Sequence, residues 1–174
     1  PAGLLDPLNE QEQLDLIAFL SRLGKPGDFD AAQGGVARFW RIGQTEHTDA
    51  QAGRERWPFD APWTDKRWTP AASLVKGSLT QGVIDEVTKR QLWAGRLGVF
   101  LATELTMAQP GRAQFTLTAG PGAELWVDGS KVGGVGSSAV ALGQGVHRVL
   151  VKLDPKQIPA EVRLECRDGV FRLD

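Results

Sequence analysis

The sequence has few of the residue types that build covalent or metal-centred sites. Its 174 residues include one cysteine, one methionine, two histidines and no tyrosine. The single cysteine, Cys166, excludes an internal disulfide and any zinc or iron–sulfur site that needs several cysteines. The fold must therefore rest on its own apolar core, which a chain of this length can build.

The sequence also has no excess of charge and no long apolar run. Twenty basic side chains stand against 21 acidic ones, so the basic surface that a nucleic-acid backbone requires is missing. No apolar run approaches the roughly 20 residues that span a bilayer. The first residues do not have the charged-then-apolar pattern of a secretory leader, and because the sequence starts abruptly at Pro1 we expect a piece of a longer protein.

The short motifs of common enzyme classes are missing too. There is no Gly-x-Ser-x-Gly elbow, His-Glu-x-x-His pair, phosphate loop or dinucleotide fingerprint. Adjacent acids such as Asp85 and Glu86 would serve glycoside hydrolysis only in a pair across a cleft, and no pattern places such a pair. We therefore expect a protein that is not an enzyme.

What the sequence does contain is 21 glycines, 10 prolines and 6 tryptophans, a composition that favours strands and turns. From about residue 91 onward, apolar residues alternate with polar ones between turn signals every 8–12 residues. Asp128–Gly129 is the strongest hairpin signal. The pattern predicts a mainly β fold, an antiparallel β-sandwich of jelly-roll type with one N-terminal α-helix.

The first of three expected segments, residues 1–27, carries that helix. Asn9 and Glu12 fit a capping box, and Asp6–Pro7 is an alternative start one turn earlier. The apolar stripe of the helix is too large to leave in water. We expect it to dock on its own sandwich near Trp40 or on a second copy, which makes the protein a monomer or a weak dimer; the stripe comprises Leu16, Ile17, Leu20 and Leu23.

The second segment, residues 28–76, is expected to hold a strand at 36–42 with Val36, Arg38, Trp40 and Ile42 on one face. A long loop with tryptophans follows, which we expect to pack on the sandwich. The third segment, residues 77–174, is the sandwich core. Residues 79–87 fit either a short strand or a helical turn.

Two stretches resemble known families. PAGLLD at residues 1–6 and LDLIAFLSRLGKPG at 14–27 resemble the end of a c-type cytochrome domain in multi-domain proteins of planctomycete-type bacteria. That resemblance implies an exported parent protein, periplasmic or extracellular, with its haem c upstream. The Cys-x-x-Cys-His attachment motif is absent, so no cofactor is expected in this chain.

The second resemblance lies in AQFTLT at 113–118, AELWVDG at 123–129 and LGQGVHRVLV at 142–151. These stretches look like the β-sandwich of the anthrax protective-antigen-type domain, which occurs in glycosidases, adhesins and toxins. Calcium-dependent lectins of that family hold their ion with an adjacent Asp-Asp pair. The dipeptide is absent here, so we expect no metal site.

The candidate ligand-binding residues are aromatic or next to an aromatic. Alternation places Trp126 and Glu124 together on the face opposite Leu125 and Val127. Trp126 is either covered by the long loop or the N-terminal helix, or it is a platform on which a sugar ring stacks. The same two interpretations hold for three loop tryptophans, Trp57, Trp63 and Trp68.

The remaining polar candidates read as structural. Asp128 fits the turn that it begins, and His147 lies on the face of two buried valines. His47 lies in a polar loop, and Cys166 shares a face with Val162 and Leu164, which predicts an inert core thiol.

Taken together, these features predict a non-catalytic accessory or recognition module of an exported cytochrome c-containing protein. Its expected partners are a polysaccharide or another domain of the parent, with no nucleic acid. The alternative is a structural appendage of a haem electron-transfer protein with no ligand of its own.

Overall fold

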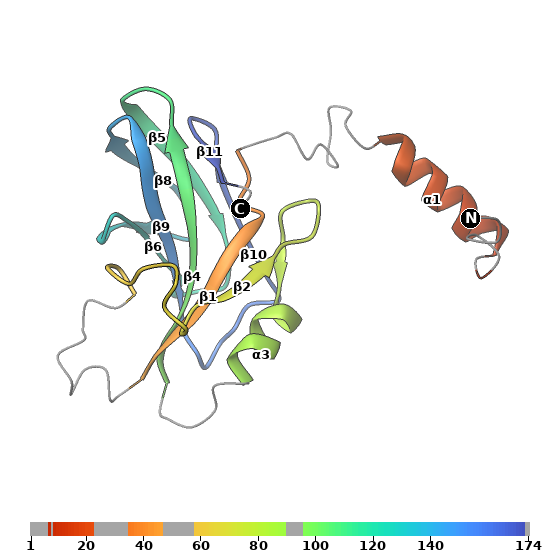
Figure 1. The fold of residues 1–174 in the computed structure, drawn as a ribbon, viewed down its shortest axis with the longest axis horizontal. Helices are drawn as coiled ribbons and strands as arrows, with labels where there is room; N and C mark the ends of the chain where they lie inside the picture. Colours follow the sequence, from red (N-terminus) through yellow and green to blue (C-terminus); the bar gives the residue numbers. More distant parts are fainter. Residues whose placement is uncertain (1–6, 8, 23–34, 47–57, 90–95, 173–174) are drawn as a thin grey trace. The chain divides into compact units, whose positions relative to one another are not determined.

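Two antiparallel sheets face each other in the computed structural model, which describes residues 7, 9–22, 35–46, 58–89 and 96–172 (Figure 1). The larger sheet has the order β2-β1-β4-β9-β6-β7, with β11 paired to β4. Its strands are β1 (Phe39–Glu46), β2 (Thr69–Ala72), β4 (Arg96–Met107), β6 (Glu124–Val127), β7 (Ser130–Gly134), β9 (Gly145–Leu153) and β11 (Val170–Phe171). The smaller sheet has the order β3-β10-β5-β8, from β3 (Leu79–Thr80), β5 (Gly111–Thr118), β8 (Gly136–Leu142) and β10 (Glu161–Cys166). The predicted β-sandwich is confirmed.

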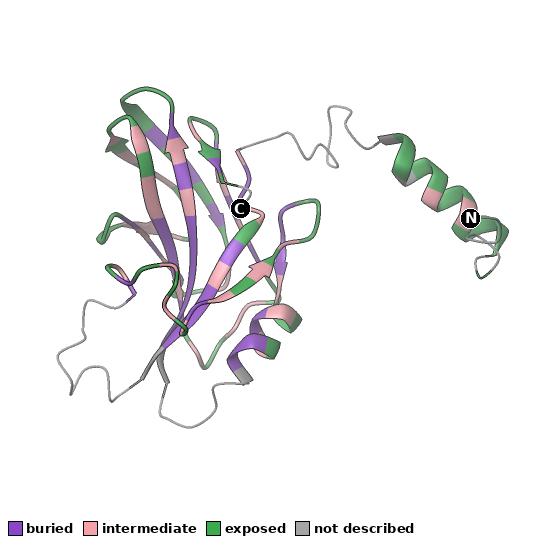
Figure 2. Cartoon of the chain, in the orientation of Figure 1, coloured by how far each residue is buried: buried purple, intermediate pink, exposed green. Residues whose placement is uncertain are grey.

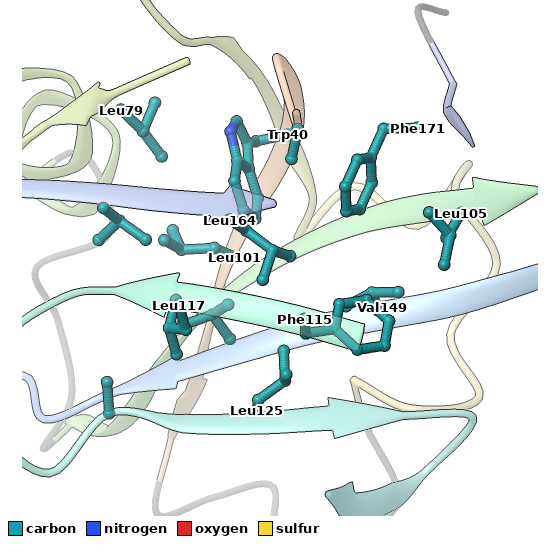
Figure 3. Packing of buried hydrophobic residues seen from close by; sticks show 14 of the residues in the cluster. Trp40, Leu79, Leu101, Leu105, Phe115, Leu117, Leu125, Val149, Leu164 and Phe171 are labelled. Carbon is teal, nitrogen blue, oxygen red and sulfur yellow. The ribbon is translucent and has the colours of Figure 1, made fainter. Parts of the chain in front are cut away.

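The core lies between the two sheets because each strand alternates apolar and polar side chains. In β5, Ala113, Phe115 and Leu117 are buried while the residues between them are exposed, an alternation that Figure 2 shows along the strands. Side chains from both sheets meet in one cluster (Figure 3). Each large side chain buried there stabilises the fold by about 1.5–3 kcal/mol, and the fully buried ones include Trp40, Leu101, Phe115, Leu125 and Phe171.

The Asp128–Gly129 turn joins β6 to β7 as predicted. Asp128 has φ of 49° and Gly129 has φ of 78°. A two-residue hairpin of this kind needs positive φ at both central residues, and Asp followed by Gly meets that need at least cost.

The strand expected at 36–42 is wrong in its bounds, since β1 begins at Phe39 and continues to Glu46. Val36 instead forms a bridge with Glu165, and the Ala37 amide donates to the Leu164 carbonyl, so this part of the chain pairs with the smaller sheet. The chain crosses between sheets near Arg38, whose guanidinium reaches the Val75 carbonyl at 3.0 Å. The crossing interrupts the single face that alternation predicted.

Residues 79–87 adopt both of the structures that the sequence left open. Leu79–Thr80 form β3, and helix α3 (Gln81–Lys89) follows directly. Leu79 and Ile84 are fully buried in the core, so the helix closes one end of the sandwich with an apolar face.

The chain divides into two compact units, residues 1–33 and 34–174. The first contains helix α1 (Glu10–Arg22), which begins directly after Asn9. The Asn9 side-chain oxygen accepts from the backbone N–H of Glu12 at 2.9 Å, and the Glu12 carboxylate accepts from the backbone N–H of Asn9 at 2.8 Å. The predicted capping box is therefore confirmed. Within the described ranges, no helix is long and apolar enough to cross a membrane.

Candidate functional site

Residues 58–68 lie over the outer face of the larger sheet, the face turned away from the core. Together with that face they form a second apolar group, here called the outer-face cluster. Its buried members are Ala61, Trp68, Phe100, Ala102 and Leu150, with Phe59, Trp63 and Trp126 packed against them. This segment is therefore a packed layer, held in place by specific contacts.

Arg148 is the main polar anchor of that layer. It lies on β9, directly opposite Glu104 on β4. Its Nη1 donates to the carbonyls of Phe59 at 2.9 Å and Ala61 at 2.6 Å, and its guanidinium lies 3.9 Å from the centre of the Trp63 ring. Burial lowers the pKa of Arg148, and the nearby carboxylates partly offset this by favouring the charged guanidinium. One side chain thus holds both the backbone and the indole of the covering segment.

Glu104 holds the edge of the same indole. The Trp63 Nε1 donates to Oε1 of Glu104 at 2.6 Å, and Arg172 donates to Oε2 at 2.9 Å. Charge-assisted hydrogen bonds of this length are among the stronger ones in proteins. Trp63 is therefore held both through its ring face and through its N–H by groups of the protein itself.

The other predicted ligand-binding residues lie in or near this cluster. Trp126 and Glu124 do share the outward face, and the Trp126 N–H donates to Glu124 at 3.1 Å. The Trp126 ring packs against Phe59 with 5.0 Å between ring centres. Hydrogen bonding by Lys131 is the main cause of the lowered pKa of Glu124. Trp68 is only 6% exposed.

Trp57 lies outside the described residues, as does His47. The structure therefore brings together three of the four candidate tryptophans, with a large part of their surface used in contacts with one another and with the sheet. The ring centres of Trp63 and Trp68 are 5.6 Å apart in an edge-to-face arrangement.

A small pocket opens beside the cluster, at the rim of the covering segment. Its volume is about 70 Å³, and its lining includes Phe39, Arg41, Trp63, Glu104 and Arg172. This volume is well below the roughly 300–1,000 Å³ that is usual for ligand sites, so the pocket is a poor candidate for a sugar site.

A much larger hollow lies on the opposite side of the sandwich, over the outer face of the smaller sheet. Its volume is about 610 Å³, within the usual range of about 300–1,000 Å³ for ligand sites. Three adjacent strands build it: Thr116 on β5 lies opposite Ser137 on β8 and Glu165 on β10, and Gln114 lies opposite Ala139. We call this surface the polar hollow; it is lined by Arg112, Gln114, Phe115, Thr116, Ser137, Ser138, Ala139, Glu165 and Arg167.

The polar hollow presents guanidinium, amide, hydroxyl and carboxylate groups on one open surface. The edge strand β8 contributes the small side chains of Ser137 and Ala139, which leave open space above the sheet. Glu165 forms an ion pair with Arg163 at 2.8 Å, and the backbone N–H of Gln114 donates to the Asp168 carboxylate at 2.7 Å. Such a surface can hydrogen-bond a polar ligand along its length.

The sequence pattern alone does not predict the polar hollow. The signal was present, because Arg112, Gln114 and Thr116 occupy alternate positions of a strand whose other face is apolar. What makes them a site is the register with β8 and β10, which sequence periodicity does not contain.

Two of the remaining polar candidates, His147 and Cys166, are engaged within the protein. His147 Nδ1 lies 2.7 Å from the Asp128 carboxylate and its Nε2 lies 3.0 Å from the Gly143 carbonyl. Cys166 is buried, and burial raises the pKa of its thiol, as expected of an inert core cysteine. In the part of the chain that the structure describes, no group of three or more His, Cys, Asp or Glu is placed to hold a metal ion.

Comparison with known proteins yields little. No family model matches the sequence, and no curated protein matches it. Among solved structures, the chain is similar to a β-glucuronidase from an uncultured Clostridium species, with 14% identity and a TM-score of 0.42. The match covers 75% of this chain and 28% of the glucuronidase chain, so the chain spans under a third of that protein's length.

Proposed function

We propose that this chain is a non-catalytic recognition module that binds a polysaccharide in the polar hollow of the smaller sheet. The observation that carries the proposal is the hollow itself, about 610 Å³ of open space over three strands, lined by polar side chains. The ligand site proposed here is on the opposite side of the sandwich from the tryptophans.

The chemistry of the lining suits a carbohydrate. Gln114, Thr116 and Ser137 offer both donors and acceptors, as the hydroxyls of a sugar require. The sheet backbone already fixes their spacing, so binding a ligand costs little conformational entropy. An open hollow also lets a polymer pass through, whereas a closed cavity would accept only its end.

The same lining supports a role without catalysis. Glycoside hydrolysis uses two carboxyl groups across the scissile bond. The lining of the hollow contains one, Glu165, and it is already engaged by Arg163. We propose in addition that the module has no cofactor of its own and works within an exported, cytochrome c-containing parent, which rests on the resemblance of residues 1–27.

The test is electrophoresis of the full chain through gels that contain neutral or acidic polysaccharides, followed by calorimetry on those that retard it. Ala139 is exposed on the lining of the hollow, so Ala139→Leu places a larger apolar side chain where the ligand would lie. Binding should weaken by about fivefold or more, which corresponds to about 1 kcal/mol of binding free energy. Ala72→Leu is the control, because Ala72 is exposed on β2, the edge strand of the other sheet.

Retardation that is lost in Ala139→Leu and kept in Ala72→Leu supports the proposal. If none of the polysaccharides binds, or if both variants bind as the parent chain does, the proposal is wrong. The chain would then be the structural appendage that is the alternative.

A further inference from the structure

We infer that the polar hollow selects an acidic polysaccharide, with Arg112 and Arg167 as the residues that bind its carboxylate or sulfate groups. The inference rests on the proposed function and names the ligand class of the same site. It follows from which charged groups in the hollow are already paired and which are not.

Arg112 and Arg167 differ from the arginines that pair with carboxylates elsewhere in the sandwich. Arg67 pairs with Asp65, Arg163 with Glu165 and Arg172 with Glu104. Arg112 and Arg167 are both exposed and both line the hollow. In the described part of the chain, neither guanidinium group makes a hydrogen bond or an ion pair with a protein group.

The acidic groups nearby are already engaged. Glu165 is bound by Arg163, which lies on the same outward face of β10 and also donates to the Lys76 carbonyl. Asp168 accepts a hydrogen bond from the backbone N–H of Gln114. The lining thus carries two guanidinium groups and one carboxylate, and that carboxylate has its own arginine outside the lining. The ligand is left to supply the missing negative charge.

Guanidinium groups suit this task better than ammonium groups. Their planar fork of N–H donors matches the two oxygens of a carboxylate or a sulfate, so binding is directional as well as electrostatic. Arg112 and Gln114 lie two positions apart on one face of β5, about 7 Å along the strand. An acidic group and a hydroxyl of one bound sugar chain would therefore be held by neighbouring side chains.

The experiment compares matched polysaccharides by calorimetry at fixed salt concentration. Polygalacturonate is compared with its methyl ester, which removes the carboxylate charge, and dextran sulfate with dextran. The variants are Arg112→Gln and Arg167→Gln, and the control is Lys66→Gln. Lys66 is exposed in the segment over the larger sheet, so its substitution removes the same charge from the opposite side of the sandwich.

We expect the charged member of at least one pair to bind at least tenfold more tightly than its neutral partner. Which pair responds tells whether carboxylate or sulfate is preferred. Each arginine variant should bind the charged member about tenfold more weakly and keep its affinity for neutral chains. Its melting temperature should stay within 2 °C of that of the parent protein. Lys66→Gln should bind as the parent does.

Equal affinity for charged and neutral chains, with Ala139→Leu still weakening binding, overturns the inference and leaves the proposed function standing. An equal loss in Lys66→Gln shows general attraction of polyanions and also overturns it. If no polysaccharide binds, the proposed function fails and the inference fails with it.

Discussion

The guanidinium carbon of Arg148 lies 3.9 Å from the centre of the Trp63 ring, whereas that of Arg41 lies 5.3 Å away. Arg148 also donates to two carbonyls of the segment that contains Trp63. A cation over an indole face in a partly desolvated place contributes about 1–2 kcal/mol. This contact fastens residues 58–68 to the sheet, so its loss should free the whole segment.

Arg148→Ala should lower the free energy of unfolding by about 2–4 kcal/mol, because partly buried carbonyls lose a charged donor and the indole loses its cation. Urea denaturation measures the loss. Hydrogen exchange should quicken at the Trp68 amide, which now donates to the Asp65 carbonyl at 3.0 Å.

Arg112→Ala is the matched control, since the side chain of that arginine makes no hydrogen bond within the described residues; its effect on the free energy of unfolding should stay within about 0.5 kcal/mol. Equal stability losses in the two variants would show that Arg148 does not anchor the segment.

His147 should make stability depend on pH. Burial alone would lower the pKa of His147, but hydrogen bonds to the Asp128 carboxylate and the Gly143 carbonyl outweigh burial, and the pKa is raised above 6.5. Both ring nitrogens face acceptors, so the protonated ring makes both bonds. The stabilisation is therefore complete below about pH 6.5, the unfolded value, and is lost as pH rises through the folded pKa.

The measurement is an NMR titration of the His147 ring, with urea denaturation between pH 5.5 and 8.5. Asp128→Asn suits the turn equally well but removes the carboxylate, so it should lower the His147 pKa and flatten the pH dependence. A His147 pKa at or below 6.5 in the parent chain would contradict the expectation.

Gly77 and Gly122 offer a matched test of steric contact. Both have positive φ, 89° and 79°, but a Cβ on Gly77 would lie 2.2 Å from Val36 Cγ1, whereas a Cβ on Gly122 would meet nothing within 4 Å. Gly122→Ala should cost only the roughly 1–2 kcal/mol of a left-handed alanine. Gly77→Ala should lower the free energy of unfolding by about 1–3 kcal/mol more than Gly122→Ala does, because Val36 must move.

Thermal and urea unfolding of both variants give the comparison. Equal losses of stability would show that the crossing near Val36 adapts freely.

Helix α1 should dock through its apolar side chains, three of which are more than half exposed in the isolated helix: Leu14, Ile17 and Leu20. Leu20→Asp places a charge in that stripe. If the helix docks on its own sandwich, the melting temperature should fall; if it docks on a second copy, the mass in sedimentation should fall toward that of one chain. A variant with unchanged melting temperature and mass would show that the helix docks on neither.

Local patterns predicted much of this fold. The alternation at Phe115 and Leu117 predicts a strand with one apolar face, and the structure buries that face. The Asp128–Gly129 turn and the Asn9–Glu12 capping box were equally readable, because both depend on residues within a few positions of one another.

Patterns that depend on distant partners were not readable. Trp126 and Glu124 were placed on the right face, but only the structure shows that Phe59, 67 positions away from Trp126, packs on that indole. The break near Arg38 escaped prediction for the same reason: Val36 pairs with Glu165, on the smaller sheet.

The sequence by itself determined that the chain is a mainly β sandwich, because period-two alternation and turn chemistry are local and each strand carries its own evidence. Only the tertiary structure decided where a ligand would sit. Arg112, Ser137 and Glu165 come from three strands, and they share one surface because the strand register aligns them. Register results from the packing of the whole core, in which a shift of one residue would turn every buried side chain outward.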